Sequence, residues 1–94
     1  MDVEFDYGRY KVKISGIGSE DTPWVIGGVD NPSAAAMIEQ IFVKNMMDKT
    51  GLDWFICQTQ LLGKDGKKIA LTTVGVKGND KTRDFYFDVT EAFK

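Results

Sequence analysis

Apolar and polar residues alternate between positions 3 and 14, a pattern typical of half-buried β-strands. The apolar residues fall first on odd positions and then on even ones: Val3, Phe5, Tyr7, Tyr10, Val12 and Ile14. The change of parity at Gly8 indicates a tight turn or a bulge, because glycine tolerates a positive φ angle. The pattern therefore predicts a short hairpin with its turn at residues 6–9.

The apolar spacing changes to that of an amphipathic helix after Asn31. Asn31 is a suitable N-cap, Pro32 suits the first helical position, and Gly51 suits the residue just past the end. These signals predict a helix over residues 32–50. One apolar face of this helix is expected to lie on a sheet, and it comprises Ala34, Ala35, Ile38, Ile41, Phe42 and Met46.

A second apolar stripe, made of Ala36, Val43 and Met47, lies roughly opposite this face. Two interpretations are open. Either the Gly-rich loop before the helix or the N-terminal hairpin covers the stripe, or the stripe is an interface with a protein partner or a second copy in a homodimer. Contiguous exposed apolar surface in a protein usually marks such an interface.

Three strand-like segments follow Gly51, over residues 53–62, 68–77 and 82–89. The Asp65-Gly66 step between the first two is a strong hairpin signal. In the middle segment the apolar residues change parity near Thr72 and Thr73, which predicts a bulge or a strong twist there.

The element order predicts an α+β fold. Residues 15–33 contain four glycines and two prolines before the helix, so they are expected to form a long loop with at most a short strand at 24–26. The prediction is a single domain over residues 1–94 with the order β-β-α-β-β-β and a short C-terminal helical turn. One long helix is expected to pack on an antiparallel meander of four or five strands.

Composition favours a binding module over an enzyme. The chain has no histidine, which excludes Ser-His-Asp triads, Cys-His pairs and histidine metal ligands. Its one cysteine, Cys57, rules out multi-thiolate metal sites and is expected to be buried in a strand. The acids Glu20, Asp21 and Asp30 lack the spacing of a calcium loop and are expected to be solvated. No catalytic residue, metal or cofactor is predicted.

A small-ligand or anion site is the first alternative. Gly27 and Gly28 precede Asn31 and Ser33, so backbone N–H groups at the start of the helix are candidates to face a phosphate or a carboxylate. Against this, the glycines match no nucleotide-binding motif, and Asp30 would repel an anion.

RNA binding through lysines of the hairpins is the second alternative. The basic residues gather at two turns: Lys64, Lys67, Lys68, Lys77, Lys81 and Arg83. The helix-strand-strand-strand-helix order resembles the double-stranded RNA-binding domain, which also needs a basic start of its last helix. Residues 90–94 do not provide that start, and the net charge of -2 gives no general attraction to nucleic acid.

The preferred hypothesis is a small noncatalytic binding or assembly module that acts through protein-protein contact. No apolar run reaches the length of a membrane span, so no membrane partner is expected. The first residues do not have the pattern of a secretion signal, and a cytoplasmic location is the default expectation.

Overall fold

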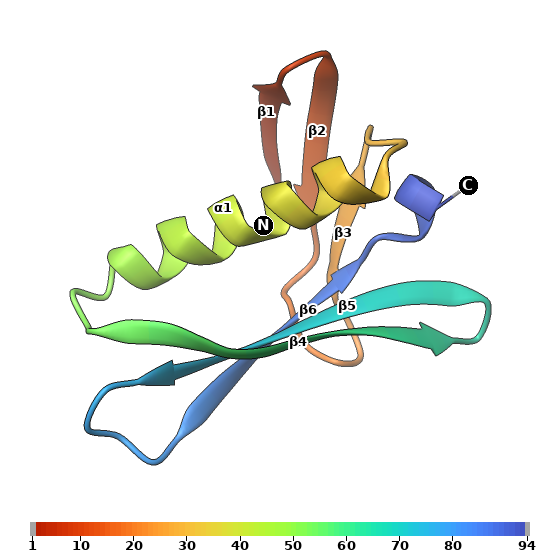
Figure 1. Ribbon diagram of the computed structural model, residues 1–94. Coiled ribbons are helices and arrows are strands. Elements are labelled where there is room, and N and C mark those ends of the chain that lie inside the picture. Colours follow the sequence, from red (N-terminus) through yellow and green to blue (C-terminus); the bar gives the residue numbers. More distant parts are fainter. Residues whose placement is uncertain (1, 94) are drawn as a thin grey trace.

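A computed structural model describes residues 2–93. Within these residues the chain forms six strands, one α-helix and a C-terminal 3₁₀ helix (Figure 1). In chain order the elements are β1 (Val3–Tyr7), β2 (Tyr10–Ser15), β3 (Trp24–Gly27), α1 (Pro32–Asp48), β4 (Trp54–Lys64), β5 (Lys67–Val76), β6 (Thr82–Asp88) and the 3₁₀ helix (Thr90–Phe93). The α+β class predicted from the sequence is confirmed.

The strands of the described residues form one mixed sheet in the order β1-β2-β3-β6-β5-β4. All neighbours are antiparallel except β3 and β6, which run parallel with Trp24 opposite Phe87. The predicted antiparallel meander of four or five strands was therefore wrong in strand number and in pairing. Residues 24–27 become a full strand because β2 and β6 pair with them from either side.

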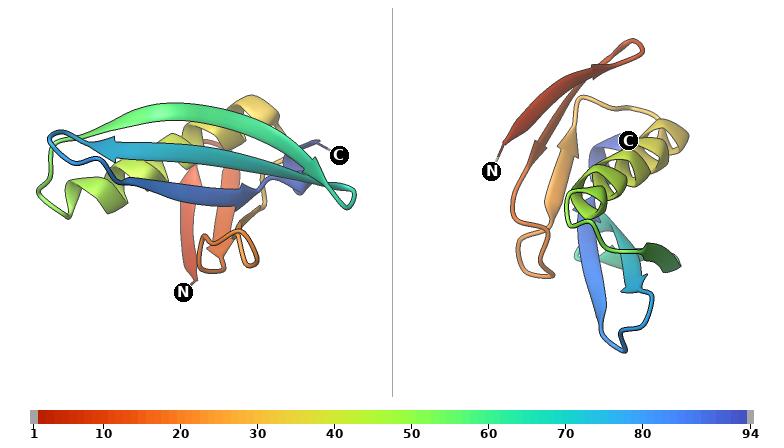
Figure 2. Two further views of the ribbon diagram at one scale, coloured as in Figure 1. Left: turned by 90° about the horizontal axis from the view of Figure 1, so that it is seen from below. Right: turned by 90° about the vertical axis from the view of Figure 1, so that its left-hand side faces the viewer.

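The sheet curves strongly around α1. Figure 2 shows that β1, β2 and β3 form one wing and β4, β5 and β6 the other, with the helix on the concave side of both. The convex side of the second wing carries no helix in the described part of the chain. None of the helices found in residues 2–93 has the length and apolar character needed to cross a membrane.

The core lies between α1 and the concave side of the sheet. Phe42 of the helix contacts the rings of Trp24 and Phe87, with centroid distances of 5.0 and 6.0 Å. The buried positions of α1 share one broad side and are Ala35, Ile38, Glu39, Phe42, Val43 and Met47. Ile41, predicted on the core side, is exposed instead. The helix thus has one wide buried arc rather than two opposed stripes.

The helix begins as predicted. The Asn31 side chain accepts a hydrogen bond of 3.0 Å from the Ala34 N–H, and Pro32 occupies the first turn. The helix ends at Asp48, two residues earlier than expected, with Lys49 as its C-cap. Gly51 has a φ of 71°, so it turns the chain toward β4 after the helix has ended.

The two predicted hairpins are present. The β1-β2 turn consists of Gly8 and Arg9, and the β4-β5 turn of Asp65 and Gly66. The predicted bulge near Thr72 and Thr73 was misplaced. The register shift lies in β4, between Ile56 and Gln58. Because β5 is a central strand buried on both faces, its apolar residues change parity without any bulge.

Gly28 is a position where the fold needs glycine. Its φ is 83°, and an added Cβ would lie 2.0 Å from the Lys11 carbonyl oxygen. We expect Gly28→Ala to lower the free energy of unfolding by roughly 2–3 kcal/mol, because both strain and backbone overlap oppose it. Gly8→Ala is the matched control, because Gly8 has a φ of 58° but no atom near the added Cβ, and it should cost only about 1 kcal/mol. Equal losses in urea unfolding would contradict the close approach of β2 and the loop after β3.

Candidate protein-binding edge of the sheet

The sheet has two edge strands of very different character. β1 has five residues and carries the acids Glu4 and Asp6 at alternate positions. β4 has eleven residues and carries no charge before Lys64, its last residue. Edge strands are normally short, charged or interrupted by proline, since their unpaired backbone groups would otherwise recruit other strands. β4 lacks these three protections, and of the other usual ones it carries a single β-bulge, between Ile56 and Gln58.

The backbone groups of β4 alternate between β5 and the open side. Lys64 and Lys67 flank a two-residue turn and form a hydrogen-bonded pair, so Gly63, Leu61 and Thr59 point their N–H and C=O groups outward. At the other end the Lys77 N–H donates to the Asp53 carbonyl over 2.8 Å. Counting from that bond, the backbone N–H and C=O groups of Trp54 and Ile56 also point outward.

The outward-pointing residues are odd-numbered near Lys64 and even-numbered near Asp53, and a bulge in β4 accounts for this change. Cys57 is the extra residue between Ile56, which pairs with Val74, and Gln58, which pairs with Thr73. Its side chain lies on the convex side, since its sulfur is 3.0 Å from the position of a Cβ added to Gly75. Cys57 is exposed, so the expectation of a buried cysteine was wrong. The reason is that the strand holding it lies at the edge.

Apolar side chains are exposed on both faces of β4. On the concave side Ile56 is 41% and Leu61 53% exposed. On the convex side Phe55 is 51% and Leu62 38% exposed. The sides follow from the register, because Leu61 lies opposite Ala70, which lies opposite the core residue Phe87. An uncharged edge with apolar groups above and below is suited to receive another strand.

A groove of about 240 Å³ runs beside this edge, between α1 and the strands β4 and β5. Ala36 and Gln40 line it from the helix, and Thr59 and Leu61 line it from β4. Glu39 also lines the groove, but it is only 9% exposed. A carboxylate is thus held at the base of a mostly apolar groove.

Burial raises the pKa of Glu39 from 4.5 to about 7. No side chain within residues 2–93 forms an ion pair or a hydrogen bond with it, so desolvation acts without compensation. Glu39 was not among the site residues predicted from the sequence, since it was grouped with the polar residues that flank the second stripe. On a helical wheel, however, it lies near the centre of the arc that contains Ala35, Phe42 and Val43, and this position was the available signal.

The predicted interface stripe is divided by the structure. Val43 and Met47 are buried within the chain, which removes them as contacts for a partner. Ala36 is exposed and lines the groove. The stripe faces the β4 side of the helix, so the wing formed by β4, β5 and β6 lies beside it. The Gly-rich loop and the N-terminal hairpin, the two candidates for covering it, lie elsewhere.

The residues predicted to bind an anion are engaged within the chain. The Gly28 N–H donates to the Glu91 carboxylate over 2.8 Å, and the Asn31 side chain caps the helix. Gly27 lies beside the same carboxylate, with an added Cβ 3.3 Å from its oxygen, whereas Ser33 is exposed on the helix. The N–H groups of Gly28 and Ala34 are therefore already bonded, the first to the Glu91 carboxylate and the second to the Asn31 side chain.

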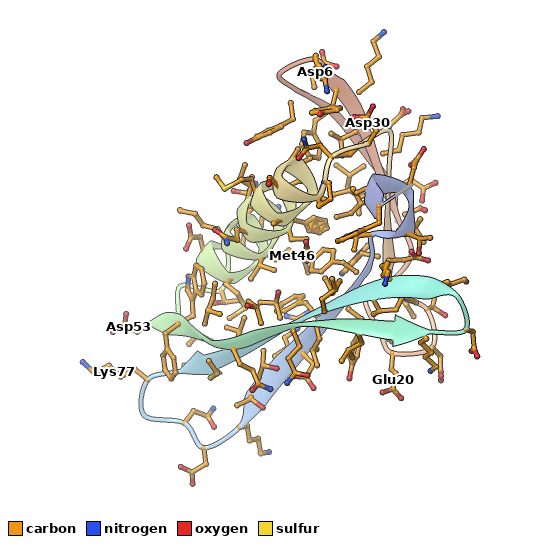
Figure 3. The ribbon with its side chains drawn as sticks, turned by 45° about the vertical axis from the view of Figure 1, so that its right-hand side comes forward. Asp6, Glu20, Asp30, Met46, Asp53 and Lys77 are labelled. Atoms are coloured by element: carbon orange, nitrogen blue, oxygen red, sulfur yellow. The ribbon has the colours of Figure 1, made fainter. Side chains whose placement is uncertain are left out.

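The remaining charged candidates are dispersed. Figure 3 shows Glu20 and Asp30 at well-separated ends of the molecule. Among residues 2–93, no three histidine, cysteine, aspartate or glutamate side chains gather in a way that could hold a metal ion. The two basic groups lie at opposite ends of β5, a strand of ten residues and about 30 Å, and so do not form one basic patch.

Comparisons with known proteins give no further indication, since the chain matches no protein family, no curated protein and no solved structure.

Proposed function

We propose that this chain is a noncatalytic assembly module that binds protein by accepting an additional strand at β4. The observation that carries the proposal is the eleven-residue edge strand without a charge before its last residue. Strand addition draws its affinity from backbone hydrogen bonds and its specificity from alternate side chains. β4 offers both kinds of contact.

The outward backbone groups supply the hydrogen bonds. Trp54, Ile56, Thr59, Leu61 and Gly63 each present an N–H and a C=O to the open side. An added strand would pair with these groups without changing the β4-β5 ladder. The edge is therefore ready for pairing in the free protein, and binding needs little reorganisation.

The flanking apolar groups supply the favourable burial. Phe55 and Leu62 on one face and Ile56 and Leu61 on the other would be covered by the side chains of a partner strand. Each large side chain brought from half-exposed to buried contributes on the order of 1 kcal/mol. Long, uncharged edges of this kind are otherwise an aggregation risk, so occupation by a partner also explains why the sequence retains it.

The test uses a phage-displayed library of extended peptides, selected against the folded protein and followed by NMR. Selected peptides are expected to shift and protect the outward amides of Ile56, Thr59 and Leu61. Leu61→Lys should weaken binding roughly tenfold or more, because a charge enters the strand-pairing surface.

Ile17→Lys is the matched control, since Ile17 is an exposed apolar residue in the loop after β2. It should leave peptide affinity unchanged. Two results together would overturn the proposal: library peptides that do not change the chemical shifts of the β4 amides, and unprotected hydrogen exchange of these amides in concentrated protein without peptide.

A further inference from the structure

The β4 strand is nearly palindromic in chemistry once the bulged Cys57 is set aside. Residues at equal distances on either side of Thr59 have matching chemistry: an acid corresponds to a base, an apolar residue to an apolar residue and an amide to an amide. The pairs are Asp53 with Lys64, Trp54 with Gly63, Phe55 with Leu62, Ile56 with Leu61, and Gln58 with Gln60. Such a sequence is complementary to itself when two copies run antiparallel.

Resting on the function proposed above, we propose that the strand received by β4 is the β4 strand of a second copy of this chain. The two strands run antiparallel about a two-fold axis at Thr59, and the two sheets join into one. A two-fold interface uses the same patch on both subunits, so a self-complementary strand is what it requires.

The backbone supports this register independently of the side chains. Outward-pointing residues must lie opposite outward-pointing residues for the new ladder to form. In the register centred on Thr59 this holds for Trp54 with Gly63, for Ile56 with Leu61 and for Thr59 with itself. Without the extra residue at Cys57, one half of each strand would present its backbone groups on the wrong side.

Charge at the two ends of β4 fixes the direction of pairing. Asp53 precedes the strand and Lys64 closes it, with ten uncharged residues between them. Figure 3 places Asp53 at the exposed end of this wing. Antiparallel pairing sets each Asp53 against the other copy's Lys64, whereas parallel pairing would set like charges together.

The other edge of the sheet does not offer the same pairing. β1 and the residue before it carry Asp2, Glu4 and Asp6, so two copies joined through β1 would bring carboxylates face to face. The two edges thus differ in what they accept. β1 repels its own copy, and β4 attracts it.

The dimer also buries the exposed apolar groups of β4 in matched pairs. Ile56 and Leu61 meet on the concave side, and Phe55 and Leu62 meet on the convex side. The two-fold axis runs normal to the joined sheet, so both α1 helices lie on the same side of it. The two grooves beside β4 then open toward each other across Thr59.

Reversing the charges at the two ends of β4 tests the dimer, because antiparallel pairing places Asp53 of each copy against Lys64 of the other. Sedimentation equilibrium of the full chain should give a dimer, twice the 10.5 kDa of one chain, at micromolar concentration. Asp53→Lys and Lys64→Asp should each weaken self-association about tenfold, because each creates two like-charge contacts. Mixing these two variants should restore association, since each chain then offers the charge that the other lacks. Lys11→Asp, an equal exchange at an exposed site on β2, should have no effect.

The outcomes separate this inference from the proposed function. A folded protein that stays monomeric overturns the dimer, and it leaves the proposed function standing if a library peptide still shifts the β4 amides. A dimer that is insensitive to both charge reversals, or variants that fail to recover on mixing, also overturns the inference, because association would then use another surface. A monomer whose β4 amides respond to no peptide overturns both.

Discussion

Glu39→Gln is expected to raise the free energy of unfolding at pH 8 by about 3 kcal/mol and to leave it nearly unchanged at pH 4. The Glu39 pKa is about 7 in the folded chain, against 4.5 for an exposed glutamate, because burial disfavours the charged form. The folded state therefore holds a proton that the unfolded state releases between these values. Below 4.5 both states are protonated and the penalty is absent.

The sign of the pH dependence follows from this difference. As pH rises from 4.5 to 7, the unfolded chain ionises first and the free energy of unfolding falls. Above 7 the folded chain carries the buried charge and the penalty stays constant. Glutamine keeps the shape of the side chain and removes the charge, so it should abolish Glu39's part of this slope.

Urea unfolding at a series of pH values and one fixed protein concentration measures the effect, because association would otherwise shift the apparent stability. Gln40→Ala, at an exposed neutral residue of α1 that lines the same groove, is the control and should leave the slope unchanged, because it changes no titratable group. A Glu39→Gln variant with the same pH profile as the parent protein would show that the carboxylate is not desolvated as the structure indicates.

Phe87→Ala is expected to lower the free energy of unfolding by about 3–5 kcal/mol. Phe87 is completely buried, and its ring lies edge-on to Phe42 with a centroid distance of 6.0 Å. It belongs to β6, which joins the two wings of the sheet, so the cavity would open where α1 and both wings meet. For a domain with a stability of about 5–10 kcal/mol, the loss would remove roughly a third or more of the free energy of unfolding.

Thermal and urea unfolding should both report this loss. Phe93→Ala removes the same side chain from the exposed 3₁₀ helix, and it should cost less than about 1 kcal/mol. If the two substitutions are equally costly, the packing of α1 against β6 is not the main source of stability.

The elements that depend on neighbouring residues were predictable from the sequence. Asn31, Pro32 and the glycine after the helix marked its ends to within two residues, because caps act locally. The Asp65-Gly66 step located the β4-β5 hairpin for the same reason. Short-range signals of this kind do not require knowledge of the rest of the fold.

The elements that depend on distant partners were not predictable in the same way. Residues 24–26 were expected to form at most a short strand within a long loop, because both flanks are rich in glycine and the partner β6 lies more than half the chain away. The parity change in β5 suggested a bulge at Thr72, although burial on both faces makes parity uninformative there. The bulge at Cys57 had no clear local signature.

The candidate site was missed for a related reason. Residues 53–62 were predicted to form a strand but were given no place in the sheet, and only the strand order reveals that β4 ends it. Glu39 was grouped with the polar residues beside the second stripe, although its place on the helix puts it within the buried arc. The edge position of β4 and the burial of Glu39 are both set by contacts between distant parts of the chain, so local sequence does not reveal them.

The single parallel contact between β3 and β6 has a consequence for the order in which the molecule folds. The β1-β2 and β4-β5 hairpins close over a few residues and can form within microseconds, whereas Trp24 and Phe87 must meet across a span of 63 residues. Joining the wings is therefore the slow step. Until it is complete, β4 lies exposed beside an unfinished core, so the yield of refolding is expected to fall as the protein concentration rises.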